Sequence, residues 1–241
     1  MSQALPTATR REGMPGLKGR NVLVTGGSSG IGQAIAVRFA EYGANVAINY
    51  LRQPEEAAEA LGGLDVLVNN AGIQISRPSA ELSSADFDRV IAVNLRGSFL
   101  CAREAIRHFL ADDAGGSIVN VSSVHQLIPK PGYLGYSASK GGMQNLTRTL
   151  ALEYAGQGIR VNGIGPGATV TPINRAWIDD PVKRAQVEEH IPMRRAGDAD
   201  EMAGVACFLA SDLAAYITGQ TIFVDGGLTL FPSFLTPWSS E

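Results

Sequence analysis

The sequence has little of the chemistry on which several protein classes depend. Its 241 residues include two cysteines and three histidines, and only 18% of them are charged. Cys101 and Cys207 stand alone, without CxxC spacing, so we expect free thiols in a reducing compartment and a cytoplasmic location. No histidines or cysteines have the spacing of metal ligands, and we expect no metal site.

Long apolar runs and a strong charge of one sign are also missing. No run reaches the roughly 18 apolar residues that a membrane span needs. A net charge of −3 gives no long-range attraction to nucleic acid or anionic lipid. We therefore expect neither a membrane nor a nucleic acid as partner. Apolar residues make up 45% of the chain, which is enough to fill the core of one large α/β domain.

The N-terminal region differs from the rest of the chain. Residues 1–18 are polar and contain glycine and proline, and they carry Arg10 and Arg11 without an apolar signal core. We expect a disordered tail there, with an organellar address as the less favoured alternative. Residues 19–241 are expected to form the domain.

Short apolar runs alternate with helical patterns from there on. The predicted strands are Asn21–Thr25, Ala44–Asn49, Leu64–Asn69, Gly116–Val121, Gly158–Ile164 and Gln220–Val224, and the main predicted helices are Ile31–Tyr42, Ser84–Ala111, Tyr136–Ala155 and Asp200–Ser211. This alternation predicts a single doubly wound Rossmann-like α/β domain, with a parallel sheet of about six strands and helices on both faces.

The connection between the second and third strands is unusually short. A parallel crossover needs about a dozen residues or more, and the stretch Tyr50–Gly63 is near that minimum. It has room for one short helix at Glu55–Leu61 and for no further strand.

A glycine-rich turn lies between the first strand and the first helix, where Thr25–Gly32 reads TGGSSGIG. Glycines let the backbone turn sharply and let a pyrophosphate approach, and the following helix offers free N–H donors. The alternative is a plain tight turn. We expect dinucleotide binding through Gly26, Ser28, Ser29, Gly30, Ile31 and Gly32. Asn70, Ala71 and Gly72 end the third strand and leave space for an adenosine, although a turn alone explains them equally well.

Tyr136 and Lys140 carry the catalytic signal. They are four residues apart near the start of a predicted helix, so they share one face. We expect the ammonium of Lys140 to lower the pKa of Tyr136, so that the phenol exchanges a proton near neutral pH. Ser123 closes the fourth strand and can hydrogen-bond a substrate oxygen. A tyrosine and lysine at this spacing are common by chance, and the combination with Ser123 and the glycine-rich turn is not.

These motifs and their order resemble those of the short-chain dehydrogenase/reductase family, over about Lys18–Phe234. The resemblance implies an enzyme that transfers a hydride between NAD or NADP and an alcohol or sugar carbon, with Tyr136 as acid/base. It also implies that Asn94 holds a water that relays protons by way of Lys140, which binds the nicotinamide ribose as well. On the nicotinamide side it implies contacts from Pro166, Gly167, Thr169 and Thr171.

One branch of the family, the glucose 1-dehydrogenases, is the most similar. The resemblance rests on Ser122–His125, Ile191–Met193 and Gly226–Phe234 among others, and it suggests substrate contacts from His125, Gln74 and Phe231. His125 is equally compatible with a loop histidine bound to backbone, and that branch often has an acidic residue at the position of Gln74. Alternatives are reduction of 3-oxoacyl or other ketone substrates, and a catalytically impaired nucleotide-binding or scaffold protein.

The resemblance also shows departures. Family members have a further helix, strand and helix where this chain has Tyr50–Gly63, including an acidic residue that contacts the adenine, so weaker cofactor binding is implied. Asn49–Arg52 contains no acidic residue that would repel a 2′-phosphate, so we expect NADP to be tolerated, with Tyr50 and Arg52 in contact with the cofactor. A solvated charge is the alternative for Arg52. The family's helix pairing between subunits implies a homotetramer.

Overall fold

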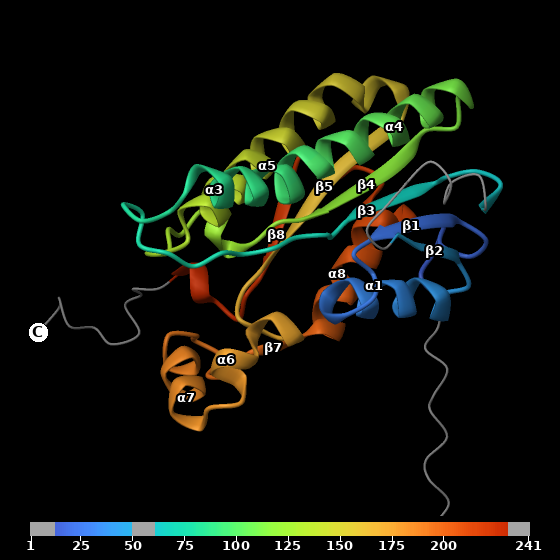
Figure 1. Ribbon diagram of the computed structural model, residues 1–241. Helices are drawn as coiled ribbons and strands as arrows, with labels where there is room; N and C mark the ends of the chain where they lie inside the picture. Colours follow the sequence, from blue (N-terminus) through green and yellow to red (C-terminus); the bar gives the residue numbers. More distant parts are fainter. Residues whose placement is uncertain (1–12, 50–60, 231–241) are drawn as a thin grey trace, which may run out of the picture.

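The computed structural model describes residues 13–49 and 61–230. Its centre is a six-stranded sheet in the order β2-β1-β3-β4-β5-β8, in which every neighbouring pair is parallel (Figure 1). The strands are β1 (Asn21–Thr25), β2 (Asn45–Asn49), β3 (Val66–Asn69), β4 (Gly116–Val121), β5 (Ile159–Pro166) and β8 (Thr221–Val224). The predicted Rossmann-like fold with six strands is confirmed for the part of the chain that the structure describes.

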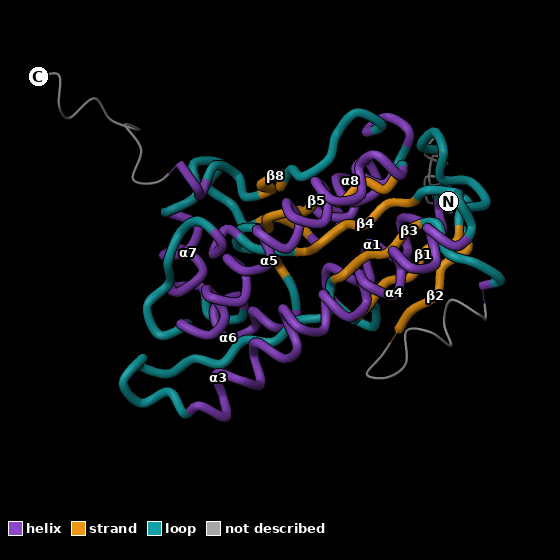
Figure 2. Tube along the Cα trace, turned by 90° about the horizontal axis from the view of Figure 1, so that it is seen from above, coloured by secondary structure: helices purple, strands orange, loops and turns teal. Residues whose placement is uncertain are grey.

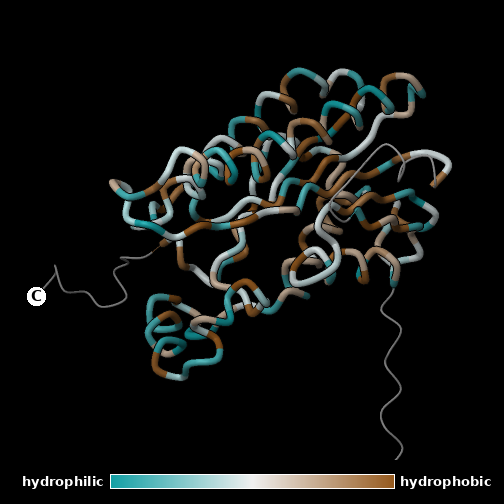
Figure 3. Tube along the Cα trace, viewed as in Figure 1, coloured by the Kyte–Doolittle hydropathy of each residue, from teal (hydrophilic) through white to brown (hydrophobic). Residues whose placement is uncertain are grey.

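Helices cover both faces of this sheet, as Figures 1 and 2 show. One face carries α1 (Gly30–Glu41) and α8 (Ala199–Ala210), and the other carries α4 (Gly97–Ala111) and α5 (Leu134–Tyr154). The strands are hydrophobic over most of their length (Figure 3) because both of their faces are covered. Two apolar cores result, one around Phe39 under α1 and α8 and one around Phe109 under α4.

The predicted helix over Ser84–Ala111 exists, but it is not uniform. It consists of α3 (Ser84–Ile91), a π-helical turn η1 (Ala92–Arg96) and α4. The Ser83 hydroxyl caps its start by accepting a hydrogen bond from the Asp86 amide at 3.1 Å. A π-turn inserts one extra residue per turn and often marks a functional position. Here it contains Asn94.

A small lobe follows β5 and was not predicted. It contains α6 (Arg175–Ile178), α7 (Pro181–Glu189) and a two-stranded ladder of β6 (Thr169–Val170) with β7 (Gly197–Asp198). The lobe lies beyond the carboxyl ends of the sheet strands (Figure 1). Short 3-10 helices complete the described chain at Val124–Gln126, Ala155–Gln157, Pro172–Asn174, Asp212–Ala214 and Leu228–Leu230.

The predicted boundary of the N-terminal tail needs correction. Leu17 is fully buried in the core beneath α1 and α8, and Met14 packs against the same core. The prediction of a disordered tail is therefore wrong for residues 13–18, because the apolar side chains of Met14 and Leu17 pack into this core. Residues 1–12 and the predicted contacts Tyr50, Arg52 and Phe231 lie outside the described residues, as does all of the helix predicted at Glu55–Leu61 except Leu61. Among the described helices, none is long and apolar enough to cross a membrane.

Candidate active site

A cavity of about 620 Å³ opens at the carboxyl ends of β1, β3, β4 and β5. Ligands bind at this edge in open α/β sheets, because the loops that leave the strands meet there. Segments far apart in the sequence line the cavity: Thr25–Gly26, Ser28–Ile31, Asn49, Asn69–Gln74, Val93, Gly97–Ser98, Cys101, Val121–Ser123, Tyr136, Lys140, Pro166–Gly167, Thr169 and Thr171–Asn174.

The glycine-rich turn is packed tightly against the end of β3. Gly26 has a positive φ of +63°, and a Cβ there would lie 2.8 Å from the Cα of Ala71. A Cβ on Gly32 would collide with the Asn70 amide and lie 2.5 Å from the Gly26 carbonyl oxygen. Asn70 Nδ2 donates to the carbonyl oxygens of Thr25 and Gly26 at 3.1 and 2.9 Å. These contacts require glycine at both positions, and they fix the shape of the turn that lines the cavity.

The first turn of α1 points donors at this cavity. Its N-cap residue Ser29 makes no side-chain capping bond, and the first turn contains no acidic residue. The backbone N–H groups and the positive end of the helix dipole are therefore available to an anion. Gly30 has a positive φ of +56°, and a Cβ there would lie 3.5 Å from the side chain of Thr171. Together with the close-packed glycines, this donor set fits the pyrophosphate of a dinucleotide.

Ser123, Tyr136 and Lys140 meet in the cavity from two elements. Ser123 follows β4, whereas Tyr136 and Lys140 lie in the first two turns of α5. A hydrogen bond to Ser123 lowers the pKa of the Tyr136 phenol, but desolvation is the larger effect and raises the pKa above its usual value. The expected lowering of the Tyr136 pKa by Lys140 is thus wrong for this structure, because burial of the hydroxyl dominates.

Lys140 is a buried ammonium with a single bond to a backbone oxygen. Only 3% of the residue is exposed, and its Nζ donates to the carbonyl oxygen of Val121 at 2.8 Å. Nζ lies 5.6 Å from the centre of the Tyr136 ring. Burial lowers the pKa of Lys140 to about 8. The ammonium of Lys140 can therefore lose and regain a proton near physiological pH.

Asn94 lies beneath the cavity and does not line it. Its side chain is fully buried in the π-turn. Oδ1 accepts the Ile73 amide at 2.8 Å, and Nδ2 donates to the Ile73 carbonyl oxygen at 2.9 Å and to Ser139 Oγ at 3.0 Å. Ser139 in turn donates to the carbonyl oxygen of Tyr136 at 2.7 Å. Both N–H groups of Asn94 are thus used to join the end of β3 to the first turn of α5.

Of the two suggested substrate residues that the structure describes, one lines the cavity and the other does not. Gln74 lines the cavity, whereas His125 does not. His125 Nδ1 contacts the Ile128 carbonyl oxygen at 3.0 Å, and its ring meets the Tyr136 ring edge-on with centroids 6.1 Å apart. Desolvation lowers the pKa of His125, so the ring is neutral at physiological pH. These contacts match the backbone-bound loop histidine that the sequence left as an alternative.

Among the described residues, every other predicted cofactor residue except Gly32 lines the cavity. Gly32 packs against Asn70 and the Gly26 carbonyl oxygen instead. The sequence prediction missed Ser98 and Cys101, which line the cavity from α4. Ser98 and Cys101 follow Asn94 by four and seven residues. Helical periodicity would therefore have predicted that the three residues share one face of the helix. It also missed Ser139, whose hydroxyl links Asn94 to Tyr136.

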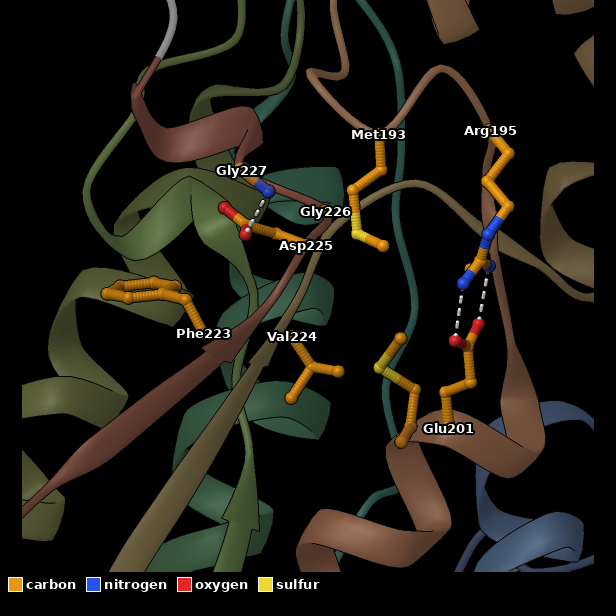
Figure 4. Close-up of a pocket in the computed structure, with 10 residues that line it drawn as sticks. Met193, Arg195, Glu201, Phe223, Val224, Asp225, Gly226 and Gly227 are labelled. Carbon is orange, nitrogen blue, oxygen red and sulfur yellow. Dashed lines mark hydrogen bonds and ion pairs between the residues drawn. The ribbon is translucent and has the colours of Figure 1, made fainter.

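A second cavity, of about 510 Å³, lies between β8 and α8 (Figure 4). Its walls include Met193 and Val224, and one side is closed by Arg195, which donates to both Glu201 carboxylate oxygens at 2.7 and 2.8 Å. This ion pair lowers the pKa of Glu201 to about 2. Ser123, Tyr136 and Lys140 are not among its lining residues, so this cavity is separate from the candidate active site.

Comparison with known families gives a clear result. A sequence model described as enoyl-(acyl carrier protein) reductase matches residues 53–229, and one described as short chain dehydrogenase matches residues 20–61. The chain belongs to the short-chain dehydrogenase/reductase family. The two matches overlap at residues 53–61, within the short connection between β2 and β3.

The chain is similar to curated proteins over most of its length. It is 49% identical to glucose 1-dehydrogenase of Gluconobacter oxydans over 256 aligned residues, which cover 92% of this chain and 96% of that protein. It is 45% identical to 3beta-hydroxysteroid dehydrogenase 1 of Eggerthella lenta over 252 residues, with coverage of 90% and 97%. Both alignments are longer than the 241 residues of this chain, so they contain positions at which this chain has no residue.

Solved structures of the family superpose closely. Aldohexose dehydrogenase of Thermoplasma acidophilum has a TM-score of 0.86 at 32% identity, with 93% of this chain and 100% of that chain covered. Gluconate 5-dehydrogenase of Burkholderia cenocepacia, in complex with NADP and tartrate, has a TM-score of 0.83 at 36% identity, with coverage of 89% and 96%. The 3-ketoacyl-(acyl-carrier-protein) reductase of Brucella melitensis, complexed with NADH, has a TM-score of 0.82 at 33% identity, with coverage of 88% and 99%.

Proposed function

We propose that this chain is an NAD(P)-dependent oxidoreductase that interconverts a CH–OH group and a carbonyl, with Tyr136 as its acid/base. The proposal rests on one observation: Ser123, Tyr136 and Lys140 line the same cavity as the uncapped start of α1. The alternative of a scaffold without activity leaves this meeting unexplained.

In this proposal the cofactor supplies a hydride acceptor or donor, and the chain moves the proton. The substrate oxygen lies between the hydroxyls of Ser123 and Tyr136, which both line the cavity. Tyr136 donates a proton to a carbonyl oxygen during reduction and accepts one during alcohol oxidation. Since burial raises the pKa of Tyr136, the protonated phenol predominates at neutral pH. Reduction is then favoured at lower pH and oxidation at higher pH.

Lys140 and Asn94 support this step in different ways. Lys140 passes protons to and from Tyr136, for which a pKa of about 8 is well suited, and its ammonium binds ribose hydroxyls. Asn94 fixes the start of α5 through Ser139. A water held at Asn94 remains part of the proposed relay. The uncapped first turn of α1 holds the pyrophosphate, and Asn70–Gly72 border the adenosine.

The proposed substrate is glucose or a related sugar, by similarity to glucose 1-dehydrogenase of Gluconobacter oxydans. Gln74 in the cavity offers an amide to a sugar hydroxyl. Reduction of 3-oxoacyl substrates is the second candidate, favoured by the similarity to the Brucella melitensis reductase. We propose use of both NAD and NADP, because Asn49 at the end of β2 is uncharged and lines the cavity.

The enzyme is proposed to work as a homotetramer in the cytoplasm. Phe99 and Leu110 on α4, and Leu134 and Leu152 on α5, are large apolar side chains that are exposed in the single chain. Pairing of these helices with those of a second subunit would cover them. Both cysteines are free, in agreement with a reducing compartment.

A steady-state substrate panel tests the activity and its class. Glucose, gluconate, a hydroxysteroid and a 3-oxoacyl thioester are each assayed with NAD(H) and NADP(H). The proposal predicts the highest kcat/KM for glucose or a related sugar. A preference for the thioester would favour the second candidate, and no turnover with any substrate of the panel would contradict this substrate range.

A further inference from the structure

The outer edge of β2 in the described fold has no part in the proposed reaction. β2 is the first strand of the sheet, and β1 is its one neighbour among the described residues. The amide of Asn45 donates to the Arg20 carbonyl oxygen at 2.8 Å, and the Asn49 carbonyl oxygen accepts the Gly26 amide at 3.0 Å. Odd-numbered positions therefore turn their backbone groups toward β1. By strand alternation, the N–H and C=O groups of Val46 and Ile48 point to the opposite edge.

Within Asn45–Asn49, β2 has none of the sequence features that prevent two sheet edges from pairing. Proteins usually protect an exposed edge with a lysine, a proline, a bulge or an inward-pointing charge. β2 reads Asn-Val-Ala-Ile-Asn, without charge, proline or glycine, and it is in regular register with β1 over all five residues. Ile48 is 50% exposed, and Val37 on the adjoining α1 is 53% exposed. An uncharged, regular strand with exposed apolar neighbours is a template for pairing with another strand.

The sequence of β2 is self-complementary about Ala47. In an antiparallel pair of two copies, Val46 of one strand lies opposite Ile48 of the other, and asparagines flank both ends. The Val46–Ile48 positions would exchange both of their outward hydrogen bonds on each side of the twofold axis, and Ala47 would face its own copy as a non-hydrogen-bonded pair. Such an isologous contact closes with twofold symmetry. A one-residue slip would place inward-turned backbone groups opposite outward-turned ones. A two-residue slip would keep the hydrogen bonds but would break the matching of Val46 with Ile48.

The chain that follows β2 is short, since β3 already begins at Val66. The alignments with two relatives are longer than this chain, so they contain positions that this chain lacks. We infer that two copies of this chain associate through antiparallel pairing of their β2 strands, forming one continuous sheet across the subunits. This interface is distinct from the α4–α5 surface and does not rest on the proposed activity.

The first experiment measures the mass of the full chain in solution. Sedimentation velocity at tens of micromolar compares the wild type, Ile48→Lys and a control, Val182→Lys, on α7, where Val182 is 68% exposed. A lysine at the paired edge should raise the dissociation constant at least about tenfold and halve the mass of the largest species. The control should leave the mass unchanged. Thermal melting of each variant checks that it is folded. Equal masses for folded Ile48→Lys and wild type would overturn the inference.

The second experiment detects the register directly and does not depend on a disruptive variant. In a non-hydrogen-bonded antiparallel pair, opposite Cα atoms are about 4.5 Å apart, which suits a disulfide. Ala47→Cys should therefore form a disulfide-linked dimer under mild oxidation. Ile48→Cys is the matched control, since residue 48 and its own copy would be about 8 Å apart in this register. A cross-link in Ala47→Cys alone supports the inference. Absence of that cross-link, or equal cross-linking of both variants and the wild type, would contradict it.

Discussion

Replacement of Lys140 by methionine should stabilise the cofactor-free protein while it abolishes most activity. The folded protein lowers the pKa of Lys140 from 10.5 to about 8. At about 1.4 kcal/mol per pH unit, burial of this ammonium costs about 3 kcal/mol at neutral pH. Methionine has a similar length and no charge. Its loss of the hydrogen bond to Val121 should cost about 1 kcal/mol, so a net gain of about 2 kcal/mol in unfolding free energy is expected.

The pH dependence of the unfolding free energy shows whether the buried charge of Lys140 causes this difference in stability. A lysine whose pKa is lower in the folded than in the unfolded state binds fewer protons when folded between pH 8 and 10.5. Stability of the wild type, relative to the variant, should therefore rise with pH across that window and stay constant below it. Urea titrations at pH 7, 8, 9 and 10 measure both. Lys183→Met, on exposed α7, is the control and should show neither effect. A Lys140→Met variant that is less stable than wild type at pH 7 would refute the reasoning.

Three further predictions concern the active site and its surroundings. Tyr136→Phe should lower kcat by about 10²- to 10⁴-fold and leave the Kd for cofactor nearly unchanged, as measured by fluorescence titration; full turnover would exclude Tyr136 as acid/base. Gly32→Ala should destabilise the fold by about 1–3 kcal/mol in urea titrations, because its Cβ would lie 2.5 Å from the Gly26 carbonyl oxygen; wild-type stability would contradict this. Truncation after Gly227 should raise KM for substrate without changing KM for cofactor if the C-terminal segment closes the substrate pocket, and should reduce the subunit number if it only joins subunits. Unchanged kinetics, mass and stability would defeat both readings.

Much of the fold could be predicted because local patterns and long-range packing agree. Apolar β-branched runs predicted the strands, and the sheet of six that the short connection after Asn49 implied is the one found among the described residues. The lobe with α6 and α7 was missed because its helices are short and polar: α7 is held by the Asp180 cap and a proline at its start, not by an apolar stripe. Leu17 was missed because a single apolar residue in a polar stretch gives no periodicity.

The candidate site was predictable in its members and not in its energetics. The sequence spacing brought Tyr136 and Lys140 to one face, and the structure places both in the cavity with Ser123. The pKa of Tyr136 could not be inferred, because it depends on desolvation by residues distant in the sequence. The link from Asn94 through Ser139 to Tyr136 also depends on a tertiary contact between the π-turn and α5.

The central claim is that this shortened chain transfers a hydride. A single-turnover experiment tests it most directly, with enzyme in excess over NADP and glucose in excess over both, so that weak cofactor binding does not hide the reaction. The account predicts that the reduced-nicotinamide absorbance rises to match the NADP present, and that Tyr136→Phe slows the rise by about 10²-fold or more. No rise with wild-type enzyme, with NADP or NAD and with any sugar or alcohol of the panel, would contradict it.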